Sequence, residues 1–429
     1  MSSRLASAIL LAVCVAQAIV SATVDPDQAD PTHHLSERWY HDENHSVHTL
    51  FRRGGNDGII YSPIGSPDWA QGFPADPALM QNMPQAWLDA LHAAIAAGKI
   101  PDIPVTTMGG PSPTYPDGYD PMSPNVCSSS YQCRIPGDIW DGPPGTLSLS
   151  FDDGPLPPSP TLYRFLKEKQ QHATHFFIGS NILQYHDYFQ TVWLDNQDDI
   201  AVHTWTHPYM TTKTNEEVLA ELGWTMQLIH NSTGGRVPKY WRPPYGDSDT
   251  RVRAIAQEVF GLTTVVWNQD TNDWSLSDPV PLTSLDQIAS QMHTWLTGPK
   301  TPGLIILEHE LSDQSVQAFM SAWDLMVSNG WKIASVAQMG DVNAYQNAWN
   351  ATSPVAPARI GEISIHPPPA SPTPSLSHDS SSTHVAQSTG KPSPPHTNQK
   401  NSATDRSAAS TMLTWLAIFV ATITVCILS

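Results

Sequence analysis

The feature that most constrains the fold of this chain is a regular alternation of short apolar runs with helical patterns between residues 141 and 345. Alternating strands and helices predict an α/β fold, with a parallel sheet and helices packed outside it. Seven such units over about 200 residues predict a distorted (β/α) barrel of about seven parallel strands, closed or nearly closed. The predicted strands are residues 146–151, 173–178, 200–203, 239–242, 263–267, 304–308 and 332–336.

Three of the predicted helices have recognisable patterns. Ser159 precedes Pro160, which is typical of a cap residue followed by a proline at the first helical position. Thr214 and Glu217 form a capping box that opens a helix running to about His230. Residues 315–328 are amphipathic. In barrels of this kind the chemistry gathers at the C-terminal ends of the strands, so reactive side chains are expected there.

Carboxylates and imidazoles follow the first and third predicted strands. Asp152 and Asp153 end the first, and because neighbouring side chains in an extended chain point apart, they can have different tasks. A solvated turn is the alternative. His203 and His207 end the third, and can converge on one ion if the segment turns helically. Two imidazoles and one carboxylate leave positions open for water and substrate, which favours a catalytic over a structural metal site.

Three later strands lead into further polar segments. Arg242 begins a loop stiffened by two prolines, where a backbone N–H could face a developing negative charge. His309 follows the sixth strand and is a candidate general acid. Asp270 or Asp273 could keep such a histidine charged and oriented. Each piece taken alone also fits an ordinary loop or a structural histidine.

The segments SFDDGP, HTWTH, RPPYG, DTNDW and LEH together resemble the five ordered motifs of the polysaccharide deacetylase family (carbohydrate esterase family 4), over about residues 140–345. The resemblance is to fungal, GPI-anchored chitin deacetylases in particular. It implies hydrolysis of the N-acetyl groups of cell-wall chitin to chitosan and acetate, with one divalent ion, zinc or cobalt. The alternatives are a deacetylase or esterase for another polysaccharide such as acetylxylan, and a non-catalytic glycan-binding wall glycoprotein.

The resemblance assigns the metal site and the base. Asp153, His203 and His207 match the family's metal ligands. Asp152 matches the general base that activates water, and Arg242 matches the arginine that positions this base. The ligand types alone do not choose between zinc and cobalt.

The resemblance also assigns the acid and the substrate pocket. His309 matches the general acid that protonates the leaving amine, and Asp273, ahead of Asp270, matches the carboxylate that tunes it. Tyr245 matches the residue whose backbone N–H stabilises the oxyanion. Leu307 and Trp274 match the apolar walls around the acetyl methyl group.

Both ends of the chain predict passage out of the cell. Residues 1–22 combine Arg4, an apolar run and small residues, as in a secretory signal peptide, and the run is short for a membrane anchor. Near the C-terminus, small residues, a polar spacer and the apolar tail 412–428 follow the order of a GPI-attachment signal, with Asn401 as the attachment residue. A plain transmembrane helix is the alternative, although no basic cluster follows the tail. We expect a secreted protein, GPI-anchored to the plasma membrane or held in the cell wall.

The remaining segments predict an extension and a stalk. Residues 23–140 are rich in Pro, Gly and Asp, with one predicted helix at 84–97. Residues 354–401 are dominated by Ser, Thr and Pro and predict a disordered stalk, followed by the GPI propeptide 402–429. The net charge of −19 argues against a nucleic-acid partner. We expect a monomer whose partners are chitin or N-acetylglucosamine oligomers and the GPI lipid.

Cysteines and sequons fit the same compartment. Removal of the two terminal segments leaves Cys127 and Cys133, which predict one local disulfide in an oxidising environment. A metal site built on this pair lacks suitable neighbours. Sequons at Asn44, Asn231 and Asn350 predict N-glycosylation.

Overall fold

A computed structural model of the chain describes residues 56–74, 80–340 and 342–361. The predicted signal peptide, the sequon at Asn44, Asn401 and the apolar tail lie outside these ranges. Within them, no helix is both long and apolar enough to cross a bilayer.

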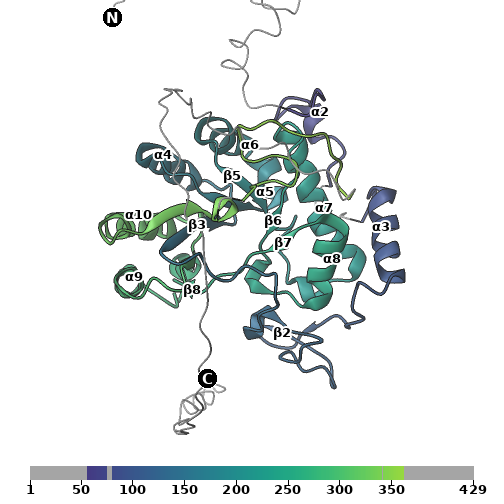
Figure 1. Ribbon diagram of the computed structural model, residues 1–429, viewed down its shortest axis with the longest axis horizontal. Helices are drawn as coiled ribbons and strands as arrows, with labels where there is room; N and C mark the ends of the chain where they lie inside the picture. The colour runs from purple at the N-terminus through teal and green to yellow at the C-terminus, as the bar shows by residue number, and fades with distance from the viewer. Residues whose placement is uncertain (1–55, 75–79, 341, 362–429) are drawn as a thin grey trace, which may run out of the picture. The chain divides into compact units, whose positions relative to one another are not determined.

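A parallel sheet of eight strands forms the centre of the described structure, which confirms the predicted α/β barrel class (Figure 1). Its strands pair in the order β7-β6-β5-β4-β3-β9-β8, and β10 also pairs with β3. In the described part, no pairing joins the end strands β7 and β8, so the barrel is open there. The strands are β3 (Thr146–Asp152), β4 (Thr174–Phe177), β5 (Asp199–Val202), β6 (Tyr240–Trp241), β7 (Thr263–Thr264), β8 (Gln269–Asp270), β9 (Leu304–Leu307) and β10 (Lys332–Ser335).

Strand β3 lies at the middle of this sheet and all of its residues are buried. It pairs with β9 and β10 through its first half and with β4 through its second half, where Asp152 lies opposite Phe176. A strand covered on both faces can present polar groups only at its end. This arrangement brings Asp152 to the C-terminal edge of the sheet.

Helices cover the outside of the sheet. Figure 1 shows α4, α9 and α10 on one side of the strands and α7 and α8 on the other. The capping box of Thr214 and Glu217 begins α7 as predicted. The predicted start of α4 is wrong by one residue, because Ser159 is already helical and its Oγ accepts the N–H of Leu156. These helices are α4 (Ser159–Lys169), α5 (Gly179–Gln184), α6 (His186–Gln190), α7 (Asn215–Ser232), α8 (Thr250–Phe260), α9 (Leu285–Thr297) and α10 (Asp313–Ser328).

The described residues 56–74 and 80–140 pack on the barrel and contribute to its hydrophobic core. They form α2 (Pro67–Ala70), α3 (Gln85–Ala96), and a hairpin of β1 (Thr107–Met108) and β2 (Pro113–Thr114). Trp87 of α3 is 1% exposed, and its indole N–H donates to the carbonyl of Ile360. A Cβ on Gly223 of α7 would lie 2.5 Å from the Trp87 ring, so the absence of a side chain there permits the close approach.

Candidate active site

Three potential metal ligands converge at the C-terminal edge of the sheet. Asp153 follows β3, while His203 and His207 follow β5. Asp153 Oδ1 lies 3.3 Å from His203 Nε2 and 3.1 Å from His207 Nε2. Ligands of a tetrahedral ion at about 2.1 Å stand about 3.4 Å apart, so this donor set fits a divalent cation.

The local backbone explains how these ligands meet. Asp153 leaves the strand with φ of 74°, so its side chain departs from the direction of Asp152. Thr204 and His207 also have positive φ, at 65° and 60°, and the chain between the two histidines turns back on itself. Burial alone would raise the pKa of Asp153, but the two imidazoles lower it well below its usual range. The carboxylate is therefore ionised, as a ligand must be.

Groups outside the ligand set fix its orientation. His203 Nδ1 lies 2.7 Å from the carbonyl oxygen of Arg242, which leaves Nε2 as the nitrogen that faces Asp153. The buried Glu221 of α7 accepts the N–H groups of Trp205 and Thr206, each at 2.8 Å. Glu221 thus holds the segment between the two histidines. The role of Glu221 was not predicted from the sequence, although an acid within the apolar face of a predicted helix is a detectable signal.

The candidate base lies beside the ligands. Asp152 Oδ1 is 2.6 Å from Arg242 Nη1, and the same guanidinium donates to Ser150 Oγ at 3.0 Å. The other oxygen, Asp152 Oδ2, lies 3.9 Å from His203 Nε2. All of these groups are buried. Arg242 therefore fixes one carboxylate oxygen and leaves the second one facing the ligand set.

The candidate acid comes from the neighbouring strand β9. A parallel bridge pairs Asp152 with His309, so the ends of β3 and β9 lie side by side. His309 Nδ1 is 2.7 Å from Asp273 Oδ1, and the backbone N–H of His309 donates to Asp273 Oδ2 at 2.9 Å. Asp270 instead accepts the N–H of Asn272, so Asp273 is the carboxylate that contacts the imidazole.

The environment of His309 keeps the ring protonated. Burial lowers its pKa, but the charge of Asp273 and the hydrogen bond to it raise the pKa more, to about 10. Asp153 and Asp152 add to this increase. An imidazolium beside the ligand set can supply a proton to a departing group.

The predicted pocket residues differ in exposure. The ring of Tyr245 is 4.7 Å from that of His207 and stacks at 4.0 Å on Tyr209. The side chains of Tyr245 and Trp274 are 53% and 37% exposed, so a ligand can reach them. Leu307 is buried at the end of β9, where it can line a wall but not an open surface.

The other predicted sites within the described ranges lie away from this centre. Cys127 and Cys133 are joined by a disulfide, as predicted. Asn231 lies in the last turn of α7 and Asn350 in the C-terminal loop, both partly exposed. Their glycosylation stays a prediction.

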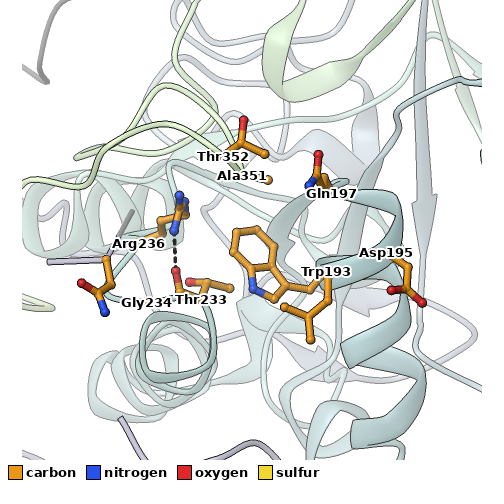
Figure 2. Close-up of a pocket in the computed structure, with 10 residues that line it drawn as sticks. Trp193, Asp195, Gln197, Thr233, Gly234, Arg236, Ala351 and Thr352 are labelled. Carbon is orange, nitrogen blue, oxygen red and sulfur yellow. Dashed lines mark hydrogen bonds between the residues drawn. The ribbon is translucent and has the colours of Figure 1, made fainter. Parts of the chain in front are cut away.

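A pocket of about 430 Å³ is separate from the site (Figure 2). It is lined by residues after α7, by Trp193 and by Ala351 and Thr352. The guanidinium of Arg236 donates to the backbone carbonyls of Thr233 and Ser353, so these hydrogen bonds orient it within the protein. None of the candidate catalytic residues lines it.

The fold and the site together define an α/β barrel with a divalent-cation site at its strand ends. The family model described as polysaccharide deacetylase matches residues 141–265. Chitin deacetylase 3 of Cryptococcus neoformans var. neoformans serotype D is 42% identical over 318 residues, or 73% of this chain and 75% of that protein. Chitin deacetylase 1 of Saccharomyces cerevisiae is 36% identical over 221 residues, or 51% of this chain and 70% of that protein.

Among solved structures, the chitin deacetylase of Colletotrichum lindemuthianum aligns with 49% of this chain and 96% of its own, at 24% identity and a TM-score of 0.44. Family membership rests on the sequence match to the Cryptococcus relative, which covers about three quarters of both chains. The chain belongs to the polysaccharide deacetylase family.

Proposed function

We propose that the protein hydrolyses the N-acetyl groups of chitin to give chitosan and acetate. The observation that carries the proposal is the ligand set of Asp153, His203 and His207 beside a base fixed by arginine and a charged imidazole. The names of the matched relatives, which are chitin deacetylases, support the choice of polymer.

Each group has a place in amide hydrolysis. A divalent cation in this site, zinc or cobalt, would polarise the carbonyl oxygen and lower the pKa of water to about 7. Asp152 accepts a proton from the attacking water while Arg242 keeps its carboxylate oriented. The backbone N–H of Tyr245 donates to the oxygen on which negative charge develops.

The second half of the reaction belongs to His309. As the carbon–nitrogen bond breaks, the sugar amine must take up a proton, because an unprotonated amine is a poor leaving group. His309, held protonated by Asp273, supplies that proton, and Asp152 carries the proton taken from water. An alkoxide leaves more readily than an amide anion, so hydrolysis of an amide depends more strongly on this acid than hydrolysis of an ester such as that of acetylxylan.

Acetate release tests this proposal directly. We expect release from chitin oligomers and from acetylxylan to differ strongly in favour of chitin, and a chelator to abolish the reaction until zinc or cobalt is added back. Faster release of acetate from acetylxylan than from chitin oligomers would show that the protein is an esterase. Binding of chitin without any acetate release would leave only a glycan-binding protein.

We also propose that the protein is secreted as a monomer and GPI-anchored through Asn401, on the plasma membrane or in the cell wall. The order of small residues, spacer and apolar tail supports the anchor. Treatment of cells with a phosphatidylinositol-specific phospholipase should release the protein into the medium. An unchanged membrane fraction after this treatment, together with retention of the tail by mass spectrometry, would contradict it.

A further inference from the structure

The polypeptide before residue 141 contacts the loop 242–249 that carries Arg242 and Tyr245. We infer that Ser129, in the segment closed by the Cys127–Cys133 disulfide, is a positioning residue for the backbone N–H of Tyr245. The inference rests on the proposed deacetylation. Ser129 lies before residues 141–265, which the family model matches, so a residue outside the matched range would support catalysis.

The inner side of the loop 242–249 contacts the active site at three points. The guanidinium of Arg242 binds Asp152, and the carbonyl of Arg242 accepts His203 Nδ1. The ring of Tyr245 contacts that of His207. A displacement of this loop would therefore move the oxyanion donor relative to the base and the ligands.

The loop 242–249 contains two residues in a backbone conformation that needs support from neighbouring groups. Tyr245 has φ of 58° and Gly246 has φ of 67°, both in the left-handed region. The left-handed conformation is unfavourable for tyrosine and persists only where neighbouring groups fix it. The stability of this conformation depends on the bonds made by the flanking carbonyls.

Ser129 makes those bonds from the outer side. Its N–H donates to the carbonyl of Ser248 at 2.8 Å. Its Oγ lies 2.6 Å from the carbonyl oxygen of Gly246 and 3.0 Å from that of Ser248, and the single hydroxyl hydrogen serves one of them at a time. Ser129 is 2% exposed, so water cannot easily replace these bonds. The neighbouring Ser130 Oγ donates to Asp247 Oδ1 at 3.1 Å.

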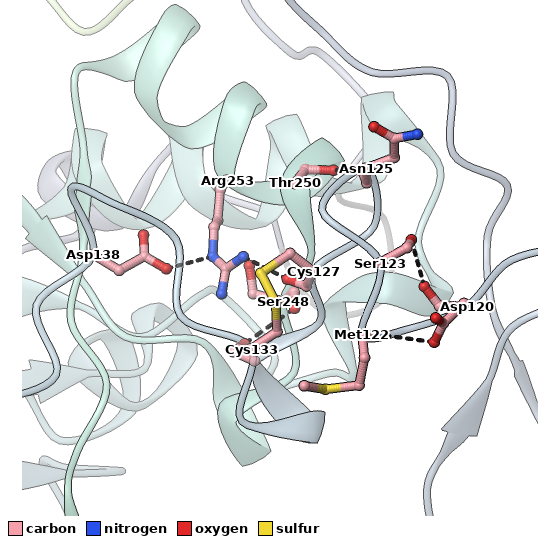
Figure 3. Close-up of a disulfide and its surroundings, with 11 residues drawn as sticks. Asp120, Met122, Ser123, Asn125, Cys127, Cys133, Asp138, Ser248, Thr250 and Arg253 are labelled. Carbon is pink, nitrogen blue, oxygen red and sulfur yellow. Dashed lines mark hydrogen bonds and ion pairs between the residues drawn. A yellow bond between two sulfur atoms is a disulfide. The ribbon is translucent and has the colours of Figure 1, made fainter. Parts of the chain in front are cut away.

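The disulfide segment is itself anchored to helix α8, which begins directly after the loop (Figure 3). Arg253 of α8 donates to the carbonyl of Cys127 at 2.7 Å and pairs with Asp138 at the same distance. The N–H of Thr250 donates to the carbonyl of Val126 at 2.9 Å. Ser129 therefore projects from a support that is fixed independently of the active site.

A second set of bonds links the same loop to the one that carries His207. Asp247 accepts the N–H of Thr211 at 2.8 Å and its hydroxyl at 2.9 Å. Thr211 in turn contacts Thr106, with their hydroxyl oxygens 2.7 Å apart. These bonds remain when the Ser129 hydroxyl is removed, so the loop should loosen rather than unfold.

Ser129→Ala tests the inference, with Ser123→Ala as the matched control. Ser123 lies four residues before Cys127, and its hydroxyl donates to the backbone carbonyl of Asp120 and not to the loop 242–249. Removing an oxyanion donor lowers kcat by about 10²–10³, so a misplaced one should lower it by about tenfold. We expect Ser129→Ala to lower kcat on a chitin oligomer by this factor with KM and zinc affinity within about twofold of wild type. Ser129→Thr, which keeps the hydroxyl, should restore kcat.

Amide hydrogen exchange supplies a readout that does not depend on activity. The amides of residues 245–248 should exchange at least about tenfold faster in Ser129→Ala than in wild type and in Ser123→Ala. An unchanged kcat or unchanged exchange would overturn the inference, as would a fall in zinc affinity as large as that in kcat. If Ser129→Ala does not fold, Ser129→Gly, which also lacks the hydroxyl, carries the same test with the same outcomes. A wild-type protein that releases no acetate would reject the proposed function, while the exchange data would still decide the role of Ser129.

Discussion

Asp152 and Asp153 are adjacent in the chain but have different surroundings. Asp152 still belongs to β3 and meets Arg242, whereas Asp153 has turned out of the strand and meets two imidazoles. One carboxylate therefore lies next to a cation that orients it, and the other joins a donor set. This difference separates the tasks of base and ligand, and substitutions can test it.

Asp152→Asn should keep the metal and lose turnover. The three ligands are untouched, while an amide cannot accept the proton of water, so acetate release should fall by about 10²–10⁴. His203→Ala should lose both. Calorimetric titration with zinc and an acetate assay on the same preparations measure the two effects. Metal-dependent turnover near the wild-type rate in Asp152→Asn would refute the base assignment.

Asp273→Asn should move the alkaline limit of activity to lower pH. The carboxylate of Asp273 keeps the pKa of His309 near 10, whereas burial alone would lower it below its usual value of about 6.5. Without that charge His309 loses its proton at lower pH, so kcat should fall from near neutral pH upward. A pH–rate profile checks this, and an alkaline limb that stays in place would contradict it.

The same pairing predicts a stability change with a defined sign. Because the pKa of His309 is raised on folding, its stabilising contribution is complete below pH about 6.5 and is lost as pH rises toward about 10. Asp273→Asn should therefore be destabilised most near pH 6 and least near pH 10. Urea denaturation at several pH values measures this, and an equal loss at every pH would contradict it.

Among the elements, helix α7 has a start that the sequence predicts and a buried acid, Glu221, whose role the sequence does not predict. Its capping box begins the helix, and the resulting phase directs Glu221 toward the segment 204–206. The box could be predicted because its two residues lie three apart. The role of Glu221 could not, because it depends on which loop covers the helix.

Glu221→Gln should weaken metal binding. An amide has no negative charge to strengthen the bonds from the two loop N–H groups, and its NH2 replaces the oxygen that accepts the Thr206 hydroxyl. The ligands therefore lose orientation, and zinc affinity should fall by about tenfold. Glu216→Gln, in the first turn of the same helix, is the control. A zinc dissociation constant within twofold of wild type in a folded Glu221→Gln protein would contradict this account.

Strand ends were predicted better than the short elements between them. The long buried run of β3 has a clear pattern, whereas β8 has two residues and no period to detect. Helix α9 was missed although its buried residues Ile288, Met292 and Leu296 recur every four positions. The residues alone did not separate Asp270 from Asp273, although the family resemblance favoured Asp273. The left-handed Asn272 turns the chain between the two carboxylates, and such a turn has no clear sequence signal.

On the scale of the whole molecule, the described residues before 141 belong to the folded protein. Its composition predicted loops apart from one helix at 84–97, which α3 confirms. Trp69, Trp87 and Leu91 are part of the barrel's core, and the sequence alone does not show which elements they pack against. The same segment supplies Ser129 to the loop beside the active site.

Trp87→Ala should therefore destabilise the entire protein by about 3–5 kcal/mol, through lost burial and a cavity between α3, α7 and α8. The indole packs edge-on against Trp224 and Phe260. Trp274→Ala, at a partly exposed site, should cost less than about 1 kcal/mol. Urea denaturation measures both. Equal losses in the two variants would show that the segment is not part of the cooperative core.

The whole account depends on one divalent ion held by Asp153, His203 and His207. Anomalous diffraction at the zinc edge from crystals of the zinc-loaded protein is the most direct measurement. We predict one peak about 2.0–2.2 Å from a carboxylate oxygen of Asp153 and from one nitrogen of each imidazole. A protein that deacetylates chitin with its zinc bound elsewhere, or with no zinc at these three residues, would contradict it.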